Sequence, residues 1–333
     1  MPRNATTAVP LLLVALAALA APPASARETA GNAAPVYWQA IAIFEGPRQD
    51  ASALDLSRAA DPGAPAGDRA KAEQFVSDHQ EEIAILLRAA AFEDSDFGIQ
   101  RDHGPDALIR HIAPMRQGAR LLMADARLRL AAGDHAAAAE RLAAVFGMAR
   151  HIAQDRLVIS GLVSTSVMLA ACQETKLGLE SRVFDKADKA VLRRALARLD
   201  PEDPCGLRSG LSGEREGFMP WLRAHADPKK REPVRVLLAG MREEPEMEVD
   251  RIMALSKREF DRAIDRADDY YAQALEAWEK PDAAEALARL QDSVAAGDFG
   301  LLGKAVAPSL TKIRQRHEEI LDQLEQLRLW LSQ

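Results

Sequence analysis

The sequence has few cysteines and no strongly basic segment, and each shortage narrows what the protein can do. Only two cysteines, Cys172 and Cys205, occur in 333 residues. The net charge is −7, and no basic cluster is larger than Lys229-Lys230-Arg231, which we interpret as a solvated turn. An acidic chain without a basic face is not expected to bind nucleic acid.

The usual sequence patterns of β-sheets and of enzyme sites are also missing. No series of alternating β-branched runs is present, and the chain has no His-Glu-x-x-His motif, phosphate loop or dinucleotide fingerprint. Ser212 lies in Gly-Leu-Ser-Gly-Glu, which lacks the final glycine of a nucleophile elbow. Ser309 and Lys312 match a Ser-x-x-Lys motif, but the later motifs of penicillin-binding enzymes are absent. We therefore predict no catalytic residue, no metal and no cofactor.

The N-terminus has the features of a secretory signal peptide. Arg3 is followed by an apolar run over residues 8–21 and by the small residues Ala24-Ser25-Ala26. We predict cleavage after residue 26 and export to the periplasm, the cell surface or the medium, with an uncleaved anchor as the alternative. The apolar stretch Leu157–Cys172 is interrupted by serine and threonine, which favours a buried helix, so no membrane span is expected after cleavage.

Apolar residues at helical spacing recur along almost the whole chain. They predict helices over about 69–91, 114–132, 135–153, 157–177, 185–199, 246–280 and 305–332. Gly133 and Asp134 should end one helix and cap the next. The segment 207–226 is expected to be helical but interrupted, because it contains Gly210, Gly213, Gly217 and Pro220.

These segments predict an all-α protein in two parts. A helical-repeat-like array is expected over residues 32–240, and an antiparallel hairpin of long helices over 241–333. The last helix has an apolar seam with alternating three- and four-residue spacing from Leu310 to Leu331. Such a seam can join helices within one chain, which we favour, or join two chains into a homodimer.

The densest cluster of polar residues lies in the loop over residues 93–105. Its candidate binding residues are Asp94, Asp96, Phe97, Asp102 and His103. An EF-hand-like calcium loop starting at Asp94 fails at its centre, where the required ligand and glycine positions are not matched. The loop is therefore interpreted as a solvated loop or as a surface that binds a partner.

The two cysteines are expected to be free thiols. Cys172 lies in the apolar helix, where a free cysteine is a common small core residue. A Cys172–Cys205 disulfide is the alternative, since an exported protein meets an oxidising environment.

Several stretches resemble a group of uncharacterised exported helical proteins from planctomycete bacteria. They are the Tyr-Trp-Gln-Ala run within Asn32–Phe44, Asp96-Phe97-Gly98, the span Ala119–Leu177, and Ser212-Gly-Glu-Arg-Glu. Residues 128–149 also resemble a tetratricopeptide helix pair, without the aromatic and proline positions of that repeat. The resemblance implies a helical-repeat fold and export, and it implies no activity.

Two functions follow as hypotheses. The first is a binding or scaffolding protein whose partner is an envelope protein or another exported protein, since stacked helices form concave surfaces. The second is a hydrolase with a site assembled around the 93–105 loop from Asp94, Asp96, Asp102 and His103.

Overall fold

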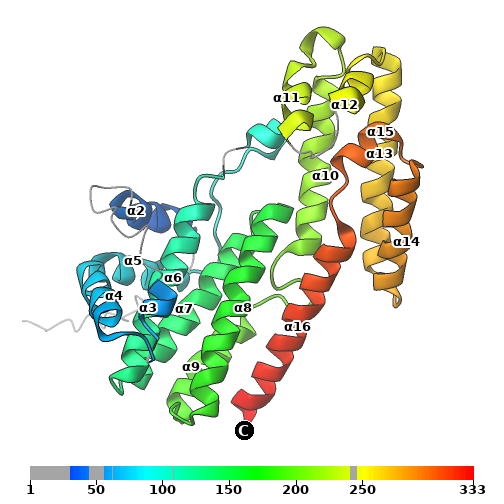
Figure 1. The fold of residues 1–333 in the computed structure, drawn as a ribbon. Helices are drawn as coiled ribbons and strands as arrows, with labels where there is room; N and C mark the ends of the chain where they lie inside the picture. Colours follow the sequence, from blue (N-terminus) through cyan, green and yellow to red (C-terminus); the bar gives the residue numbers. More distant parts are fainter. Residues whose placement is uncertain (1–30, 45–55, 62, 108, 241–245) are drawn as a thin grey trace, which may run out of the picture.

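The computed structural model describes residues 31–44, 56–61, 63–107, 109–240 and 246–333, and it confirms the all-α class. The predicted signal peptide and its cleavage site lie outside this part of the chain. The α-helices (Figure 1) are α2 (Ala34–Phe44), α3 (Leu56–Ala59), α4 (Ala66–Asp78), α5 (Gln80–Ala90), α6 (Ile112–Ala131), α7 (His135–Ala153), α8 (Val158–Glu180), α9 (Lys186–Ala197), α10 (Leu207–Ala224), α11 (Glu232–Gly240), α12 (Glu246–Met253), α13 (Lys257–Trp278), α14 (Ala283–Ala296), α15 (Gly300–Val306) and α16 (Leu310–Ser332). The 3₁₀ helices of the described residues, η2 (Arg101–Asp106) and η3 (Pro228–Lys230), lie in the connections.

The largest core lies around α7, which packs against α5, α6, α8 and α9. The apolar spacing in α7 predicts a buried face that ends at Ala153, which is half-buried; its other members are buried: Ala138, Leu142, Val145, Phe146, Ala149 and Ile152. Gly133 takes a left-handed conformation with φ of 80°, and the Asp134 side chain accepts the backbone N–H of Ala137. The predicted end of α6 and the predicted cap of α7 are therefore confirmed.

One side of helix α8 is buried although it contains several hydroxyl residues, whereas Ile159, Leu162 and Leu177 of the same helix are exposed. Ser164 Oγ donates a hydrogen bond to Ala149 O at 2.7 Å, and Thr165 Oγ1 donates to Gly161 O at 2.8 Å. These bonds satisfy the hydroxyl groups of Ser164 and Thr165, which are both buried. Within the described residues, no helix has both the length and the apolar character needed to cross a membrane.

Helix α10 is continuous, so the predicted interruption of this segment is wrong. Its glycines are sites of close contact, because they lie against the backbone of neighbouring segments. A Cβ atom on Gly213 would lie 2.0 Å from the carbonyl oxygen of Arg156, and one on Gly217 would lie 2.5 Å from that of Arg101. The glycines thus let α10 approach two loops closely, at some cost in helix propensity.

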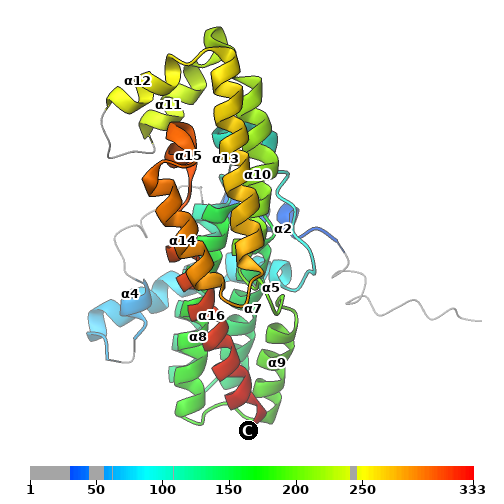
Figure 2. The same cartoon turned by 90° about the vertical axis from the view of Figure 1, so that its right-hand side faces the viewer.

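The predicted hairpin between the last long helices is not confirmed. Helix α13 packs mainly against α10, α14 and α15, whereas α16 packs against α8, α9 and α14. Figure 2 shows α16 lying across α8 and α9. The buried face of α16 is the predicted seam: Leu310, Ile313, His317, Ile320, Leu324, Leu327 and Leu331. Because these contacts join residues on both sides of position 240, the repeat-like array over 32–240 is not confirmed either.

Two predicted long helices are each divided into two. The segment 69–91 breaks at His79, between α4 and α5, and the segment 246–280 breaks between α12 and α13. At the second break, the Ser256 side chain accepts the backbone N–H of Glu259, and the Glu259 carboxylate accepts that of Ser256 at 2.8 Å. This capping box starts a new helix where the apolar pattern alone predicts continuity.

Arg231 is buried, so the interpretation of the basic cluster as a solvated turn is wrong for this residue, whereas Lys229 and Lys230 are exposed. Its guanidinium donates to the carbonyl oxygens of Met253 at 3.0 Å and Leu255 at 2.7 Å, and also to that of Ala226. It also lies over the ring of Phe260, 4.1 Å from the centroid. Arg231 therefore joins the ends of α10 and α12 from inside the fold.

Candidate functional site

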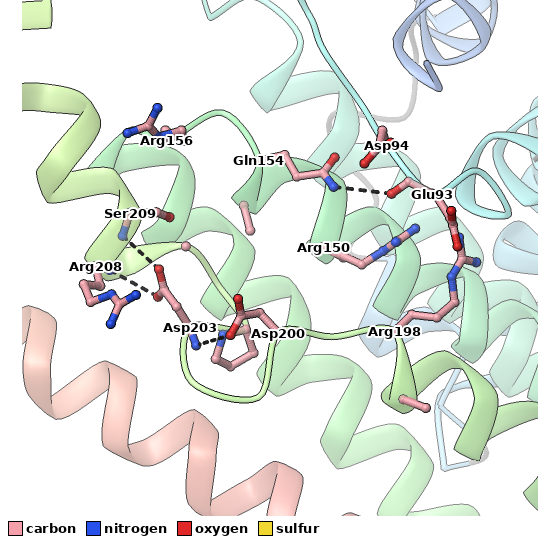
Figure 3. A pocket seen from close by; sticks show the side chains of 14 residues that line it. Glu93, Asp94, Arg150, Gln154, Arg156, Arg198, Asp200, Asp203, Arg208 and Ser209 are labelled. Atoms are coloured by element: carbon pink, nitrogen blue, oxygen red, sulfur yellow. Dashed lines mark hydrogen bonds between the residues drawn. The ribbon is translucent and has the colours of Figure 1, made fainter. Parts of the chain in front are cut away.

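A polar pocket of about 660 Å³ opens between the end of α7, the end of α9 and the start of α10. It is shown in Figure 3. Its lining contains four arginines, four acids and only small apolar residues: Glu93, Asp94, Arg150, Ala153, Gln154, Arg156, Ala197, Arg198, Asp200, Asp203, Pro204, Gly206, Arg208 and Ser209. Its size is within the range of small-molecule sites.

The floor of the pocket is the turn between α9 and α10, which two aspartates hold in place. Asp200 Oδ1 accepts the backbone N–H of Asp203 at 2.9 Å. The Asp203 carboxylate in turn accepts the backbone N–H groups of Arg208 at 3.1 Å and Ser209 at 2.8 Å. Gly206, with φ of 69°, lets this turn approach the end of α7. Both carboxylates therefore have structural partners.

The two arginines at one end of the pocket are paired with acids outside its lining. Arg156 Nη2 lies 2.6 Å from Glu216 Oε1, and Arg208 forms an ion pair with Glu279. In Figure 3, Arg156 and Arg208 lie on the opposite side of the pocket from Glu93 and Arg198. Their charges are thus already compensated.

Arg150 and Arg198, at the other end, have backbone partners. Both donate from Nη2 to the carbonyl oxygen of Phe92, and Arg198 also donates to that of Ala91 at 3.0 Å. Neither guanidinium forms an ion pair with a carboxylate in the described part of the chain. Since a guanidinium has five N–H donors, both keep donors for a ligand.

The guanidiniums of Arg150 and Arg198 are both cationic, and they repel each other because the shared acceptor holds them close together. Burial, followed by the charge of Arg198, lowers the pKa of Arg150 to about 10. Two hydrogen bonds to one oxygen keep the donor nitrogens within about 6 Å, where the repulsion is about 3 kcal/mol at an effective dielectric constant of about 20. A bound anionic group would relieve this repulsion.

A buried histidine, His151, lies next to Arg150. The pKa of His151 is lowered to about 3, mainly by burial and then by Arg150. Its neutral ring makes hydrogen bonds with Tyr37 Oη, at 2.8 Å from Nδ1, and with Phe92 O, at 3.1 Å from Nε2. The ring of His151 therefore helps to hold the surroundings of Arg150 in place without adding a positive charge.

The segment that contains Glu93 and Asp94 is fixed by its backbone. Gln154 Oε1 accepts the N–H of Ser95 at 2.7 Å, and Asn32 Oδ1 accepts the N–H of Asp96 at 2.7 Å. The side chains of Glu93 and Asp94 are exposed, and neither carboxylate is held by an ion pair or hydrogen bond within the described residues. Their charges are therefore available to a ligand in the pocket.

The structure brings only one of the predicted loop residues to this pocket, Asp94. Asp96 Oδ1 accepts the N–H of Gly98 at 2.8 Å. Phe97 is partly buried, and its ring stacks on that of His111 with 3.8 Å between centroids. Asp102 and His103 are exposed in η2, which packs against α10. The five residues thus do not converge on one site.

Sequence reasoning missed Arg150 and Arg198. Both lie at helix C-termini, where arginine is common because it interacts favourably with the helix dipole. Their relation depends on the packing of α7 against α9, and no local motif reports it.

Another group of residues has the composition of a catalytic triad, although its geometry is different. Ser160 Oγ donates to Asp155 Oδ2 at 2.7 Å, and His111 Nε2 lies 2.9 Å from the same oxygen. In a hydrolase the serine must bond to the histidine. All three residues are buried, so this group acts in packing. No group of three or more potential metal ligands occurs in the described residues.

Cys172 and Cys205 are both buried and are not bonded to each other. Cys205 Sγ lies 3.7 Å from Met168 Sδ. Burial is the main cause that raises the pKa of Cys172 to about 12 and that of Cys205 to about 11. The structure therefore contains two free, unreactive thiols, as predicted.

Comparison of the chain with protein-family models, with curated proteins and with solved structures finds no match, so the site is interpreted from its own geometry.

Proposed function

We propose that the protein is a non-catalytic binding protein and that its site is the pocket between α7, α9 and α10. The observation that carries this proposal is the arginine pair. Arg150 and Arg198 converge on the carbonyl oxygen of Phe92, lack carboxylate partners in the described residues, and line a pocket of about 660 Å³. Such a pair binds carboxylate or phosphate groups by charge-assisted hydrogen bonds.

Binding without chemistry is the simplest function for this site. Among the described residues that line the pocket there is no histidine or cysteine, and the aspartates at positions 200 and 203 already accept backbone hydrogen bonds. The alternative of a hydrolase around the 93–105 loop has little support, because Asp96, Asp102 and His103 lie outside the pocket.

We also propose that the protein acts after export. The support for this part is the predicted signal peptide with its Ala24-Ser25-Ala26 cleavage site. Mass spectrometry of the natively expressed protein should find Arg27 as the first residue. A mature form that keeps Met1 or Arg3 would support the uncleaved anchor instead.

Binding at the arginine pair can be tested with N-acetylglycylglycine, a small molecule with one carboxylate and no cation. NMR of the arginine Nε–Hε groups should show its binding to the wild type. Arg198→Gln should weaken binding about fivefold or more, whereas Arg194→Gln should not weaken it. Arg194 is a matched control because it is exposed on the same helix and outside the pocket. Equal binding by wild type and Arg198→Gln would refute the proposed site.

A further inference from the structure

The unpaired charges at one end of the pocket have both signs. Arg150 and Arg198 are cationic, and the exposed carboxylates of Glu93 and Asp94 lie at the same end (Figure 3). Asp94 and Glu93 are close enough to Arg150 to counteract part of the lowering of its pKa. The four side chains therefore sum to no net charge within a small volume.

The remaining lining limits the ligand further. Within the described part of the chain, its apolar members are Ala153, Ala197, Pro204 and Gly206, and none of its side chains there is aromatic or branched aliphatic. A ligand with a large apolar or aromatic group would find no matching surface there, because such groups bind through buried apolar area. The pocket suits a small ligand that is polar along its whole length.

We propose that this pocket binds a zwitterion of the amino acid or short peptide class. The ligand carboxylate contacts Arg150 and Arg198, and its ammonium group contacts Glu93 and Asp94. This inference rests on the proposed function, because it names the chemical class of the ligand at the same site.

The charge balance selects against ligands of a single sign. A simple anion is attracted by the arginines and repelled by the two acids. A simple cation is attracted by the acids and repelled by the arginines. A zwitterion compensates both pairs and leaves the charge of the site unchanged. Since the acids lie on an exposed segment, their contribution falls with salt, and binding is best measured at low ionic strength.

Three matched probes test the proposal: glycylglycine, its N-acetyl form without the ammonium group, and its amide without the carboxylate. Titration calorimetry should show glycylglycine binding at least about fivefold more tightly than either derivative. The double variant Glu93→Gln/Asp94→Asn should bind glycylglycine no more tightly than N-acetylglycylglycine. Asp96→Asn is the control, because Asp96 is exposed on the same segment outside the pocket and an amide oxygen can still accept from Gly98.

The outcomes separate this inference from the proposed function. If N-acetylglycylglycine binds as tightly as glycylglycine, and Arg198→Gln weakens both, the pocket is an anion site and the zwitterion proposal is wrong. If no probe binds in a manner that depends on Arg198, the proposed function fails as well. Circular dichroism of each variant ensures that a loss of binding does not reflect a loss of fold.

Discussion

Gly206 is the residue at which the pocket depends most on a single backbone conformation. It has φ of 69°, and a Cβ atom at this position would lie 2.4 Å from the carbonyl oxygen of Ala153. Gly206→Ala should therefore incur two penalties. A left-handed conformation costs an L-residue about 1–2 kcal/mol. Steric overlap with a backbone atom costs about 1–3 kcal/mol, because the oxygen cannot rotate away. After a gain of up to about 1 kcal/mol from a less flexible unfolded chain, the net loss is about 1–5 kcal/mol.

Two other glycines separate these penalties. Gly133 has φ of 80°, and a Cβ atom there would have no neighbour within 4 Å, so Gly133→Ala should show the conformational cost alone. Gly213 lies in regular helix against Arg156 O, so Gly213→Ala should show the steric cost alone. Gly67→Ala is a baseline, because this exposed helical position has open space.

Urea unfolding followed by circular dichroism measures all four variants. We expect Gly206→Ala to be the least stable, Gly133→Ala and Gly213→Ala to be intermediate, and Gly67→Ala to be equal to or more stable than wild type. If Gly206→Ala unfolds within about 0.5 kcal/mol of wild type, the argument from close backbone contact is wrong.

Three further predictions concern charge, the last helix and the thiols. Burial raises the pKa of Glu214 to about 7, so the folded protein holds a proton that the unfolded chain releases near pH 4.5. The contribution of Glu214 to the free energy of unfolding is present below pH 4.5 and is lost as pH rises to 7, by at most about 1.4 kcal/mol per pH unit. Urea unfolding at several pH values should show a smaller pH dependence for Glu214→Gln than for the wild type. Leu324 is fully buried, so Leu324→Asp should lower the free energy of unfolding by more than about 3 kcal/mol and unfold the protein. If ultracentrifugation shows instead that the substitution converts a dimer into a folded monomer, the intrachain packing of α16 is contradicted. Cys172 and Cys205 should resist a thiol reagent in the native protein and both react after unfolding without reductant, whereas no reaction and no intermolecular product would indicate a disulfide.

The features of the fold that could be predicted from the sequence are those set by residues close together in the chain. The apolar stripe of α7 and the Gly133-Asp134 boundary are both set by residues a few positions apart, and both are confirmed. The prediction for the glycines of α10 was wrong because glycine disfavours helix in isolation. What keeps them helical is the close approach of the 156–158 and 101 backbones, and that is a tertiary effect.

The seam of α16 shows a second limit. Its spacing correctly indicated which side chains are buried, from Leu310 to Leu331. The partner was not predictable, because the spacing of a seam shows which side chains are buried and not which element covers them; in the structure α16 packs against α8 and α9.

The candidate site was the least predictable part. Arg150 and Arg198 come from different helices and meet only at the carbonyl oxygen of Phe92, which leaves no mark in the sequence. Asp94 was found because it lies in a clearly acidic loop, but its neighbours in that loop have other partners.

The position of α16 has a consequence for how the chain is made. Its buried seam completes the surface of α8 and α9, which are synthesised more than a hundred residues earlier. During synthesis those helices emerge from the ribosome first, and the apolar surface that α16 covers stays exposed until the final segment of the chain is made. A message truncated between codons 210 and 309 therefore yields a product that lacks this cover, and quality-control proteases should remove it although the residues of the pocket are all present.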